Sequence, residues 1–418
     1  MKKIILLLFI LTNLQSFSQI GTGSPYSFIG FGETNFKGNH LNRAMGGIDV
    51  YIDSIHPNIK NPSSYGALKA TTYSVGVNYR QNNIEDEINR QKITSSSIDY
   101  IGVSIPTKRF GFGFGILPYS SVGYLLEDLN ENDQTNKINR FTGEGGLNQA
   151  FLNVGFKVID GLNLGISSNY GFGDITYRKS QVIEGVSNGT YSESNSSLSG
   201  ISFKFSANIT IPIKKLQFYT MLGYIPEAKL TSRNIEIIYT RSIIGGLSEL
   251  GDIEETDLKS SGLDETYFTI PKAISIGFGI GKNKKWFVGG QLDQVNSTSF
   301  KNQFINQPNV SYQKSNKISA GGFYIPEFSS ITSYWKRVVY RFGFRSENKG
   351  YLINNHSIKE NGITFGVGLP MAGYSNTNVT FEFGQLGTKK NNLIRENFWA
   401  LRLGFSLNDI WFIKRKYN

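Results

Sequence analysis

The chain has 418 residues, of which 39% are hydrophobic and 18% charged, and its formal net charge is +11. Charged residues are fewer than the roughly 25% of an average soluble domain, while Gly (46), Phe (30) and Tyr (22) are abundant. The aromatic content excludes a disordered chain, and the lack of cysteine excludes a disulfide framework, a cysteine-based zinc site and a thiol nucleophile. No run of about 18 apolar residues predicts a transmembrane helix.

Residues 1–18 have the order of a secretory signal peptide. Lys2 and Lys3 form a positive start, residues 4–11 are all apolar, and Ser16 and Ser18 form a small-x-small cleavage site. We expect cleavage after Ser18 and export of the chain, without a lipid anchor because no cysteine follows the site. The alternative is a short buried helix, which is disfavoured because no core-like helical sequence follows.

Residues 19–70 do not show the pattern of membrane strands. The segment is rich in Gly, Asn and Pro, yet it contains many large apolar side chains, including Tyr26, Phe31, Met45 and Tyr65, and is too apolar for a flexible tail. We predict that it forms an N-terminal hatch, or plug, in the lumen of the barrel that the following residues indicate. The alternative is a periplasmic extension packed against the outside of that barrel.

From residue 71 to residue 418, stretches in which large apolar residues alternate with small or polar ones follow one another. Residues 274–281 read Ile-Ser-Ile-Gly-Phe-Gly-Ile-Gly, and residues 110–116 read Phe-Gly-Phe-Gly-Phe-Gly-Ile. A period of two predicts strands with one apolar face, and most stretches reach the roughly 9–11 residues that a tilted strand needs to cross a membrane. Fourteen strands are predicted, near residues 72–80, 97–107, 109–118, 149–160, 162–178, 199–212, 216–228, 267–281, 284–297, 314–325, 336–346, 362–370, 376–386 and 397–408.

The predicted connections alternate in length. Short turns, with one longer exception at 326–335, alternate with long connections at 81–96, 119–148, 179–198, 229–266, 298–313 and 347–361. Bacterial barrels have an even number of strands, short periplasmic turns and long extracellular loops. We therefore predict an all-β fold, a fourteen-stranded antiparallel transmembrane β-barrel in the outer membrane. The alternative is a secreted β-sandwich or propeller, but a sandwich would carry many charges on its second face, which here is mainly Gly, Ser, Asn and Thr.

Four charged residues are predicted to face the lumen. Arg341 and Arg345 alternate with large aromatic residues, and Glu382 and Arg402 occupy equivalent positions in their strands. A charge on the lipid face costs about 2–4 kcal/mol at the membrane midplane, which favours the inward orientation. These four side chains contact a ligand, or they pair with one another and with the hatch; we favour pairing.

No catalytic or cofactor-binding pattern is present. His40, His56 and His356 are dispersed and accompany no serine–carboxylate arrangement, so we predict no enzyme activity, no metal site and no cofactor. Lys and Arg are scattered, which predicts no nucleic-acid partner. Two basic clusters, in the turn at 282–285 and at 414–416, are interpreted as solvated charges near anionic headgroups, and the alternative is a periplasmic docking surface.

Several short motifs are shared with one family of barrels. They are Ser24-Pro25-Tyr26-Ser27 with Gly30-Phe31-Gly32, Arg43-Ala44-Met45-Gly46-Gly47, Asn61-Pro62-Ser63-Ser64-Tyr65, residues 117–124 (Leu-Pro-Tyr-Ser-Ser-Val-Gly-Tyr), 145–149 (Gly-Gly-Leu-Asn-Gln) and 407–412 (Leu-Asn-Asp-Ile-Trp-Phe). Their order resembles that of the FadL-type outer-membrane transport proteins, in the branch common among Bacteroidota. The resemblance spans nearly the whole mature chain.

The resemblance implies a fourteen-stranded barrel with the N-terminal segment folded into its lumen. It implies that Met45, Gly46 and Gly47 belong to the hatch, and that Asn61, Pro62 and Ser63 correspond to an Asn-Pro-Ala sequence that helps to close the lumen on the periplasmic side. Ser63 departs from that pattern because it adds a hydroxyl group. The alternative for these three residues is an ordinary rigid turn without a role in gating.

Family members commonly pass hydrophobic compounds through the outer membrane. The resemblance therefore implies passive uptake of small hydrophobic molecules, fatty-acid-like or aromatic, through a hatch-gated barrel that contacts outer-membrane lipid. The alternative is an accessory or structural barrel whose partner is a protein of a type IX secretion complex or of another surface-assembly complex. Fold is a weak guide between these functions.

Overall fold

The computed structural model describes residues 21–129, 137–242, 250–300, 302–305, 307, 309–371 and 375–410. The predicted signal peptide at 1–18 and the basic cluster at 414–416 lie outside these residues.

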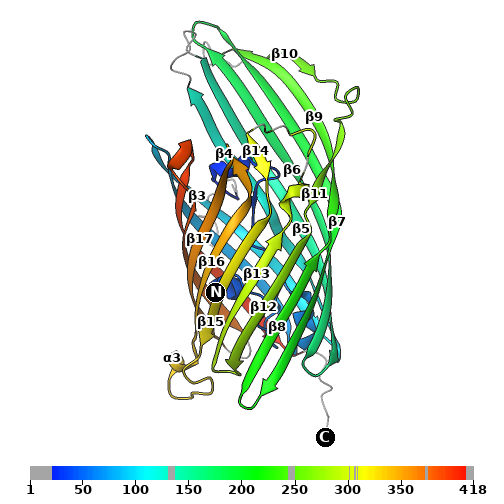
Figure 1. The fold of residues 1–418 in the computed structure, drawn as a ribbon, viewed down its shortest axis with the longest axis vertical. Helices are drawn as coiled ribbons and strands as arrows, with labels where there is room; N and C mark the ends of the chain where they lie inside the picture. Colours follow the sequence, from blue (N-terminus) through cyan, green and yellow to red (C-terminus); the bar gives the residue numbers. More distant parts are fainter. Residues whose placement is uncertain are drawn as a thin grey trace, which may run out of the picture.

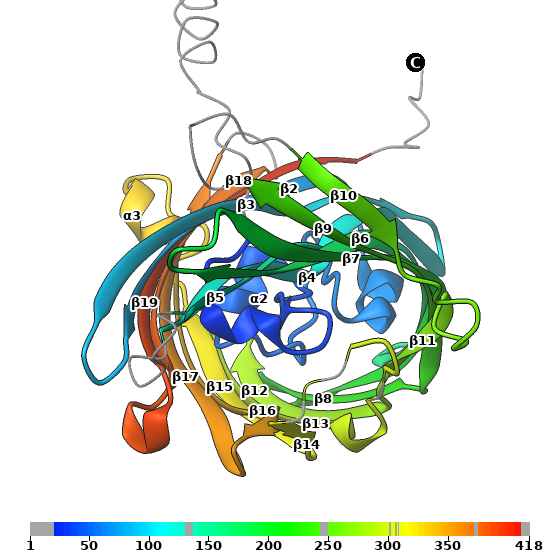
Figure 2. The same ribbon diagram turned by 90° about the horizontal axis from the view of Figure 1, so that it is seen from above.

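The chain forms a closed antiparallel β-barrel of fourteen wall strands, which confirms the predicted fold class (Figures 1 and 2). The pieces β8–β9, β10–β11–β12 and β14–β15 each continue along one wall strand, and the last strand pairs with β2 to close the ring. The wall consists of β2 (Thr71–Glu85), β3 (Arg90–Pro106), β4 (Phe110–Leu129), β5 (Lys137–Ile159), β6 (Leu162–Ile183), β7 (Asn188–Ile213), β8 (Leu216–Ile225), β9 (Ala228–Ser242), β10 (Leu250–Glu255), β11 (Glu265–Ile270), β12 (Ala273–Lys282), β13 (Trp286–Val295), β14 (Val310–Tyr312), β15 (Ser315–Tyr324), β16 (Val339–Ile353), β17 (His356–Pro370), β18 (Asn376–Gly387) and β19 (Arg395–Asp409).

The outside of the wall carries an apolar belt. In β4, Phe110, Phe112 and Phe114 point outward and are 46%, 38% and 47% exposed, and the glycines between them point inward. The same alternation places exposed Ile, Leu, Val, Phe and Tyr side chains on the other wall strands. A belt of this kind is typical of barrels that cross a membrane. Among the described helices, none is long and apolar enough to span a membrane.

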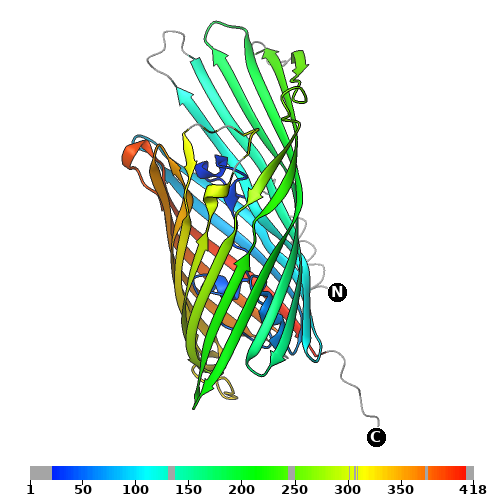
Figure 3. The same ribbon diagram turned by 45° about the vertical axis from the view of Figure 1, so that its right-hand side comes forward.

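One side of the barrel is much taller than the other. Strands β5 and β7 have 23 and 26 residues, whereas β13 and β18 have 10 and 12. The tall wall, formed by β4 to β7 and β9, rises beyond the rest of the ring at the end opposite the short turns (Figures 1 and 3). We call the two ends the tall-wall end and the short-turn end.

The prediction of long loops at 81–96, 119–148, 179–198 and 229–266 is wrong in large part. Strands occupy most of these residues, and the links that remain include a turn at 86–89 and one at 184–187. Beyond the apolar belt, the outer face meets water and carries charges, such as Arg178, which lies 2.8 Å from Glu144 and 2.7 Å from Glu193. Because this face has no need of apolar side chains, the alternation that marks a membrane strand disappears from the sequence.

Residues 21–70 lie inside the barrel, and we call them the luminal segment (Figure 2). Its elements are η1 (Pro25–Phe28), β1 (Glu33–Thr34), α2 (His40–Ala44) and η2 (Pro62–Ala67). Outside it, short helical turns occur at η3 (Ser297–Ser299), α3 (Tyr334–Arg337) and η4 (Lys390–Asn392). Strand β1 pairs with β4 on the inner side of the wall, and η2 packs against β4, β5, β6 and β7.

Inward-facing glycines let the luminal segment touch the backbone of the wall. A Cβ atom added at Gly155 or Gly165 would clash with the backbone of η2, and one added at Gly111 would clash with the Tyr65 carbonyl group. On the opposite side, a Cβ at Gly321 or Gly343 would fall on the backbone of Met45 and Gly46. At these five glycines the lumen is filled by main chain of the luminal segment.

We predict that Gly155→Ala destabilises the barrel by about 1–3 kcal/mol, because an overpacked interior must shift its backbone. The midpoint of urea unfolding in detergent micelles, followed by tryptophan fluorescence, measures the change. Gly171→Ala is the matched control: this inward-facing strand glycine would place its Cβ 3.6 Å from Leu230, an ordinary contact. Equal midpoints for the two variants would contradict the packing argument.

Candidate functional site

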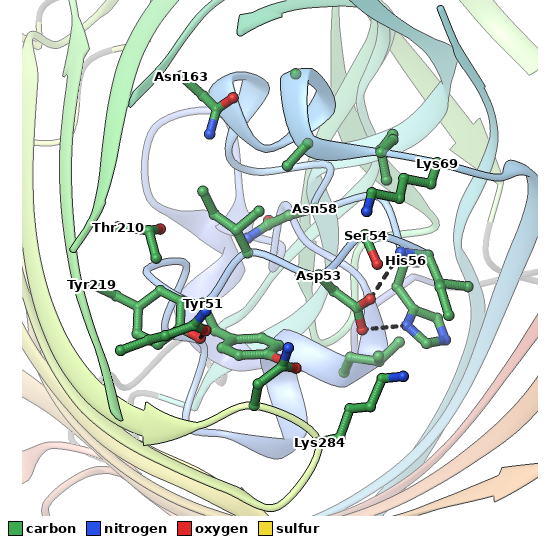
Figure 4. Close-up of a pocket in the computed structure, with 18 of the residues that line it drawn as sticks. Tyr51, Asp53, Ser54, His56, Asn58, Lys69, Asn163, Thr210, Tyr219 and Lys284 are labelled. Carbon is green, nitrogen blue, oxygen red and sulfur yellow. Dashed lines mark hydrogen bonds and ion pairs between the residues drawn. The ribbon is translucent and has the colours of Figure 1, made fainter. Parts of the chain in front are cut away.

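A large cavity opens at the short-turn end between the luminal segment and the strand ends (Figure 4). Its volume is about 1130 Å³. The close-up shows Thr210 and Tyr219 of the wall on one side, with Tyr51 of the luminal segment beside Tyr219, and Asp53 and His56 on the other side. We call it the short-turn cavity.

A second, central cavity lies deeper in the barrel and has a volume of about 270 Å³. Nine basic and five acidic side chains line it, namely Lys37, Arg43, Lys60, Arg80, Lys204, Lys317, Arg345, Lys349 and Arg402 with Glu33, Asp99, Asp293, Glu347 and Glu360. Helix α2 stands between the cavities, since Asn42 lines the first and its neighbour Arg43 lines the second. The centre of the lumen is thus strongly charged.

Glu382 is the centre of a buried ion-pair cluster. It is completely buried and accepts two hydrogen bonds of 2.7 Å each from Arg43 of the luminal segment, and it also pairs with Arg345 at 2.5 Å and with Arg402. Arg345 contacts Glu360 at 2.5 Å in addition. We call Arg43, Arg345, Glu382 and Arg402 the Glu382 cluster. Because it joins α2 to three wall strands, it fixes the luminal segment in place.

The lysines of the central cavity differ in how they are paired. Lys60 lies 2.8 Å from Asp49 and 3.5 Å from Asp293, whereas Lys37 lies over the ring of Tyr119, 3.3 Å from its centroid. Burial lowers the pKa of Lys37 to about 7, and the neighbouring charges of Lys204 and Lys60 act in the same direction.

The predicted hatch motif at 61–63 bonds to the wall. The Asn61 amide donates to the Asp49 carbonyl at 3.1 Å and to the Asn208 side chain at 2.6 Å. The Ser63 backbone N–H donates to Ser206 at 2.8 Å, and the Ser63 hydroxyl lies within hydrogen-bond distance of the side-chain oxygens of Asn61, at 2.8 Å, and Asn208. The additional hydroxyl of Ser63 therefore has partners, and Pro62 begins η2, where its missing N–H is not needed.

The predicted motif at 45–47 ends helix α2 against the other side of the wall. Gly46 and Gly47 have φ angles of +73° and +86°, which L side chains rarely adopt. The Gly47 N–H donates to the Asn42 carbonyl at 2.8 Å, and the Gly46 N–H donates to the Thr364 hydroxyl at 3.2 Å. Met45 is buried in a cluster with apolar side chains of the wall.

Of the four charges predicted to face the lumen, three lie in one cluster. Arg345, Glu382 and Arg402 are joined as described above, whereas Arg341 lies apart, 3.0 Å from Asn378, and lines the short-turn cavity. The sequence reasoning missed Arg43, although it stands in a quoted motif. A buried arginine needs a carboxylate, but sequence alone does not say which of the wall carboxylates meets it.

The histidines of the luminal segment also pair with carboxylates. His40 lies 3.0 Å from Asp99, and His56 lies 2.6 Å from Asp53. Burial lowers the pKa of His40, although the hydrogen bond to Asp99 acts in the opposite direction. Within the described ranges, no group of three or more His, Cys, Asp or Glu side chains is arranged to hold a metal ion.

The wall is interrupted beside the central cavity. Strand β7 pairs with β9 up to Ser199 and with β8 from Phe205 onward. Pro226 separates β8 from β9, and Pro271 separates β11 from β12. Proline has no N–H to donate to a neighbouring strand, so the ladder is weakened there. Apolar side chains that line the central cavity at this interruption are Phe203, Ile225, Ile270, Ala273 and Val295.

Solved structures share this architecture. The toluene transporter TodX of Pseudomonas putida matches with a TM-score of 0.58 and 12% identity, covering 91% of this chain and 100% of that one. The CymD monoaromatic hydrocarbon channel matches with a TM-score of 0.57 and 11% identity, over 90% and 97% of the two chains. A Pseudomonas aeruginosa FadL homologue matches with a TM-score of 0.55 and 12% identity, over 92% and 100%. The fold is that of the FadL-type barrels.

The chain belongs to the BamG family, because a family model described as BamG matches residues 1–418. The comparison with curated protein sequences finds no match. The FadL-type fold that the motifs implied is thus present.

We predict that Glu382→Gln destabilises the protein by about 3–5 kcal/mol, because three buried guanidinium groups lose a shared carboxylate. Urea unfolding in micelles measures the change. The control is Glu127→Gln, which removes an exposed pair with Arg140 on the tall wall and is expected to cost about 0–1 kcal/mol. A Glu382→Gln barrel as stable as the control would show that the cluster does not anchor the luminal segment.

Proposed function

We propose that this protein is an outer-membrane barrel with a closed lumen that serves as an accessory subunit docked to a protein assembly at the cell surface. One observation carries the proposal: the luminal segment is bound to both sides of the wall, by main-chain contact at inward glycines and by the buried Glu382 cluster. A barrel filled in this way offers its surfaces to partners and keeps its interior closed.

Placement in the outer membrane is supported by the apolar belt and by the signal peptide predicted at 1–18. In bacterial barrels the short turns face the periplasm and the longer connections face the outside. On that basis the short-turn cavity faces the periplasm and the tall wall stands above the outer surface of the membrane.

The charged lining of the central cavity favours this function over transport of apolar compounds. An apolar molecule placed there would remove water from charged side chains and offer them no hydrogen bonds, which is costly. The cavity of about 270 Å³ is also slightly below the usual range of ligand pockets, roughly 300–1,000 Å³.

Two surfaces are available for protein partners. The tall wall carries exposed apolar side chains, including Leu125, Ile235 and Ile253, at 60%, 57% and 61% exposure. The short-turn end carries the large cavity and a concentration of lysines in its turns, among them Lys108, Lys214 and Lys284. Exposed apolar patches mark protein interaction sites, and a basic surface attracts a partner of opposite charge.

We expect native mass spectrometry of the tagged protein, extracted in mild detergent from its own outer membrane, to show a stoichiometric complex with other proteins. A free barrel that carries only a small hydrophobic molecule would contradict the proposal. The isolated barrel is expected to show no steady conductance in planar bilayers, since the luminal segment fills the lumen, and a stable open channel would also count against it.

Uptake of small hydrophobic molecules is the second candidate, and the interrupted wall favours it. The apolar side chains around Ala273 connect the central cavity to the wall beside Pro226 and Pro271, and the similar solved structures include toluene transporters. If this function operates, cells that lack the protein take up radiolabelled toluene more slowly, and Ala273→Trp reduces uptake because its bulk fills the central cavity beside the interrupted wall. Ile274→Trp, at the adjacent outward-facing position, is the control. Equal uptake by all strains would exclude this function for toluene.

A further inference from the structure

The short-turn cavity is larger than a small-molecule site. Its volume of about 1130 Å³ exceeds the roughly 300–1,000 Å³ of common ligand pockets. It lies within the ring of strand ends, and the luminal segment forms its inner boundary (Figure 4). A cavity of this size, open at one end, has room for several residues of another polypeptide.

The charge of the cavity is predominantly basic. Five Lys and Arg side chains line it against two carboxylates. Asp160 pairs with Lys157, and burial raises the pKa of Asp53, but His56 and Arg341 hold that pKa below its ordinary value, so the Asp53 charge is already compensated. Three lysines make no ion pair with any described residue, and they are Lys69, Lys108 and Lys284.

The cavity also has an apolar wall. The centroid of the Tyr51 ring lies 4.9 Å from the ring centroids of both Phe287 and Phe323. Ile325 lines the cavity beside these rings. At the rim, Phe328 is 47% exposed with the Lys284 ammonium 4.7 Å from its ring centroid. In the same turn Ile331 is 99% exposed. Free basic groups thus alternate with open apolar surface.

The position of these lysines selects the kind of partner. Charges on the outside of a barrel reach lipid headgroups, but Lys69 and Lys284 project into the cavity inside the ring (Figure 4). Bilayer lipid surrounds the outer face of the wall, so its headgroups are not the natural counterions of side chains in the lumen. A soluble anionic group that enters the cavity from the periplasm can reach these lysines and pair with them.

We propose that the short-turn cavity receives an acidic segment of a periplasmic protein, with carboxylates paired to Lys69 and Lys284 and with apolar side chains packed on Tyr51 and Phe328. The inference rests on the proposed docking function and specifies where one partner binds and what its segment contains. Opposite charges on the two surfaces speed their encounter and fix the register of docking.

Photocrosslinking in living cells tests the proposal. A benzophenone amino acid replaces Thr210, whose side chain points into the cavity (Figure 4), and mass spectrometry of the crosslinked peptide identifies the segment that it reaches. We expect one periplasmic protein segment with a net negative charge. The same probe in place of Ile213, which is 51% exposed and lies outside the cavity, is expected not to reach that segment.

Charge reversal supplies the matched comparison. The double variant Lys69→Glu, Lys284→Glu is expected to reduce the crosslink at least about tenfold through like-charge repulsion. Lys214→Glu is the control because Lys214 and Lys284 are turn lysines with the same φ of +55°, and Lys214 does not line the cavity. Heat-modifiable migration on gels verifies that all variants are folded.

The outcomes separate this inference from the proposed function. Crosslinks only to lipid, crosslinks to a neutral or basic segment, no crosslink, or a crosslink that survives the double charge reversal would each overturn the inference. If native mass spectrometry still shows a stoichiometric protein complex in those cases, the docking function stands and the partner binds elsewhere. If no complex is present at all, the docking function itself fails.

Discussion

The structure depends on one constraint: fourteen strands enclose a lumen too wide for the side chains of the wall to fill. The chain meets this constraint with its own N-terminal residues. Where η2 and the end of α2 meet the main chain of the wall, the wall supplies glycine, and where the segment brings Arg43, the wall supplies Glu382. The apolar belt outside and the polar contacts inside are two consequences of the same strand alternation.

The two sides of the luminal segment differ in chemistry. Toward the tall-wall end it meets a compact cavity in which charges face one another at short distances. Toward the short turns it leaves a wide cavity with uncompensated lysines and exposed rings. A closed core between two unlike ends suits a protein that acts through its surfaces, and this is why we place docking before transport.

The fold was predictable because a membrane strand must alternate. Phe110 to Ile116 and Ile274 to Gly281 show the period of two without ambiguity. The same logic failed beyond the membrane, where strands such as the upper part of β7 (Asn188–Ile213) carry Ser, Asn and Glu and were predicted as loop. Because side chains alternate between the two faces of a strand, the sequence predicted the inward orientation of Arg345, Glu382 and Arg402. It did not predict the point at which these side chains meet. That point depends on the barrel's stagger and on Arg43, more than 300 residues earlier in the chain.

The contact between Ser24 and Glu396, 372 residues apart in the chain, has a consequence for biogenesis. The luminal segment touches β4, β5 and β6 on one side of the β2–β19 seam and β16 to β19 on the other. The closed ring therefore surrounds a segment that precedes its strands in the chain, and the final strand supplies some of that segment's partners. A chain cut short before β19 would leave the seam open and Ser24 without Glu396.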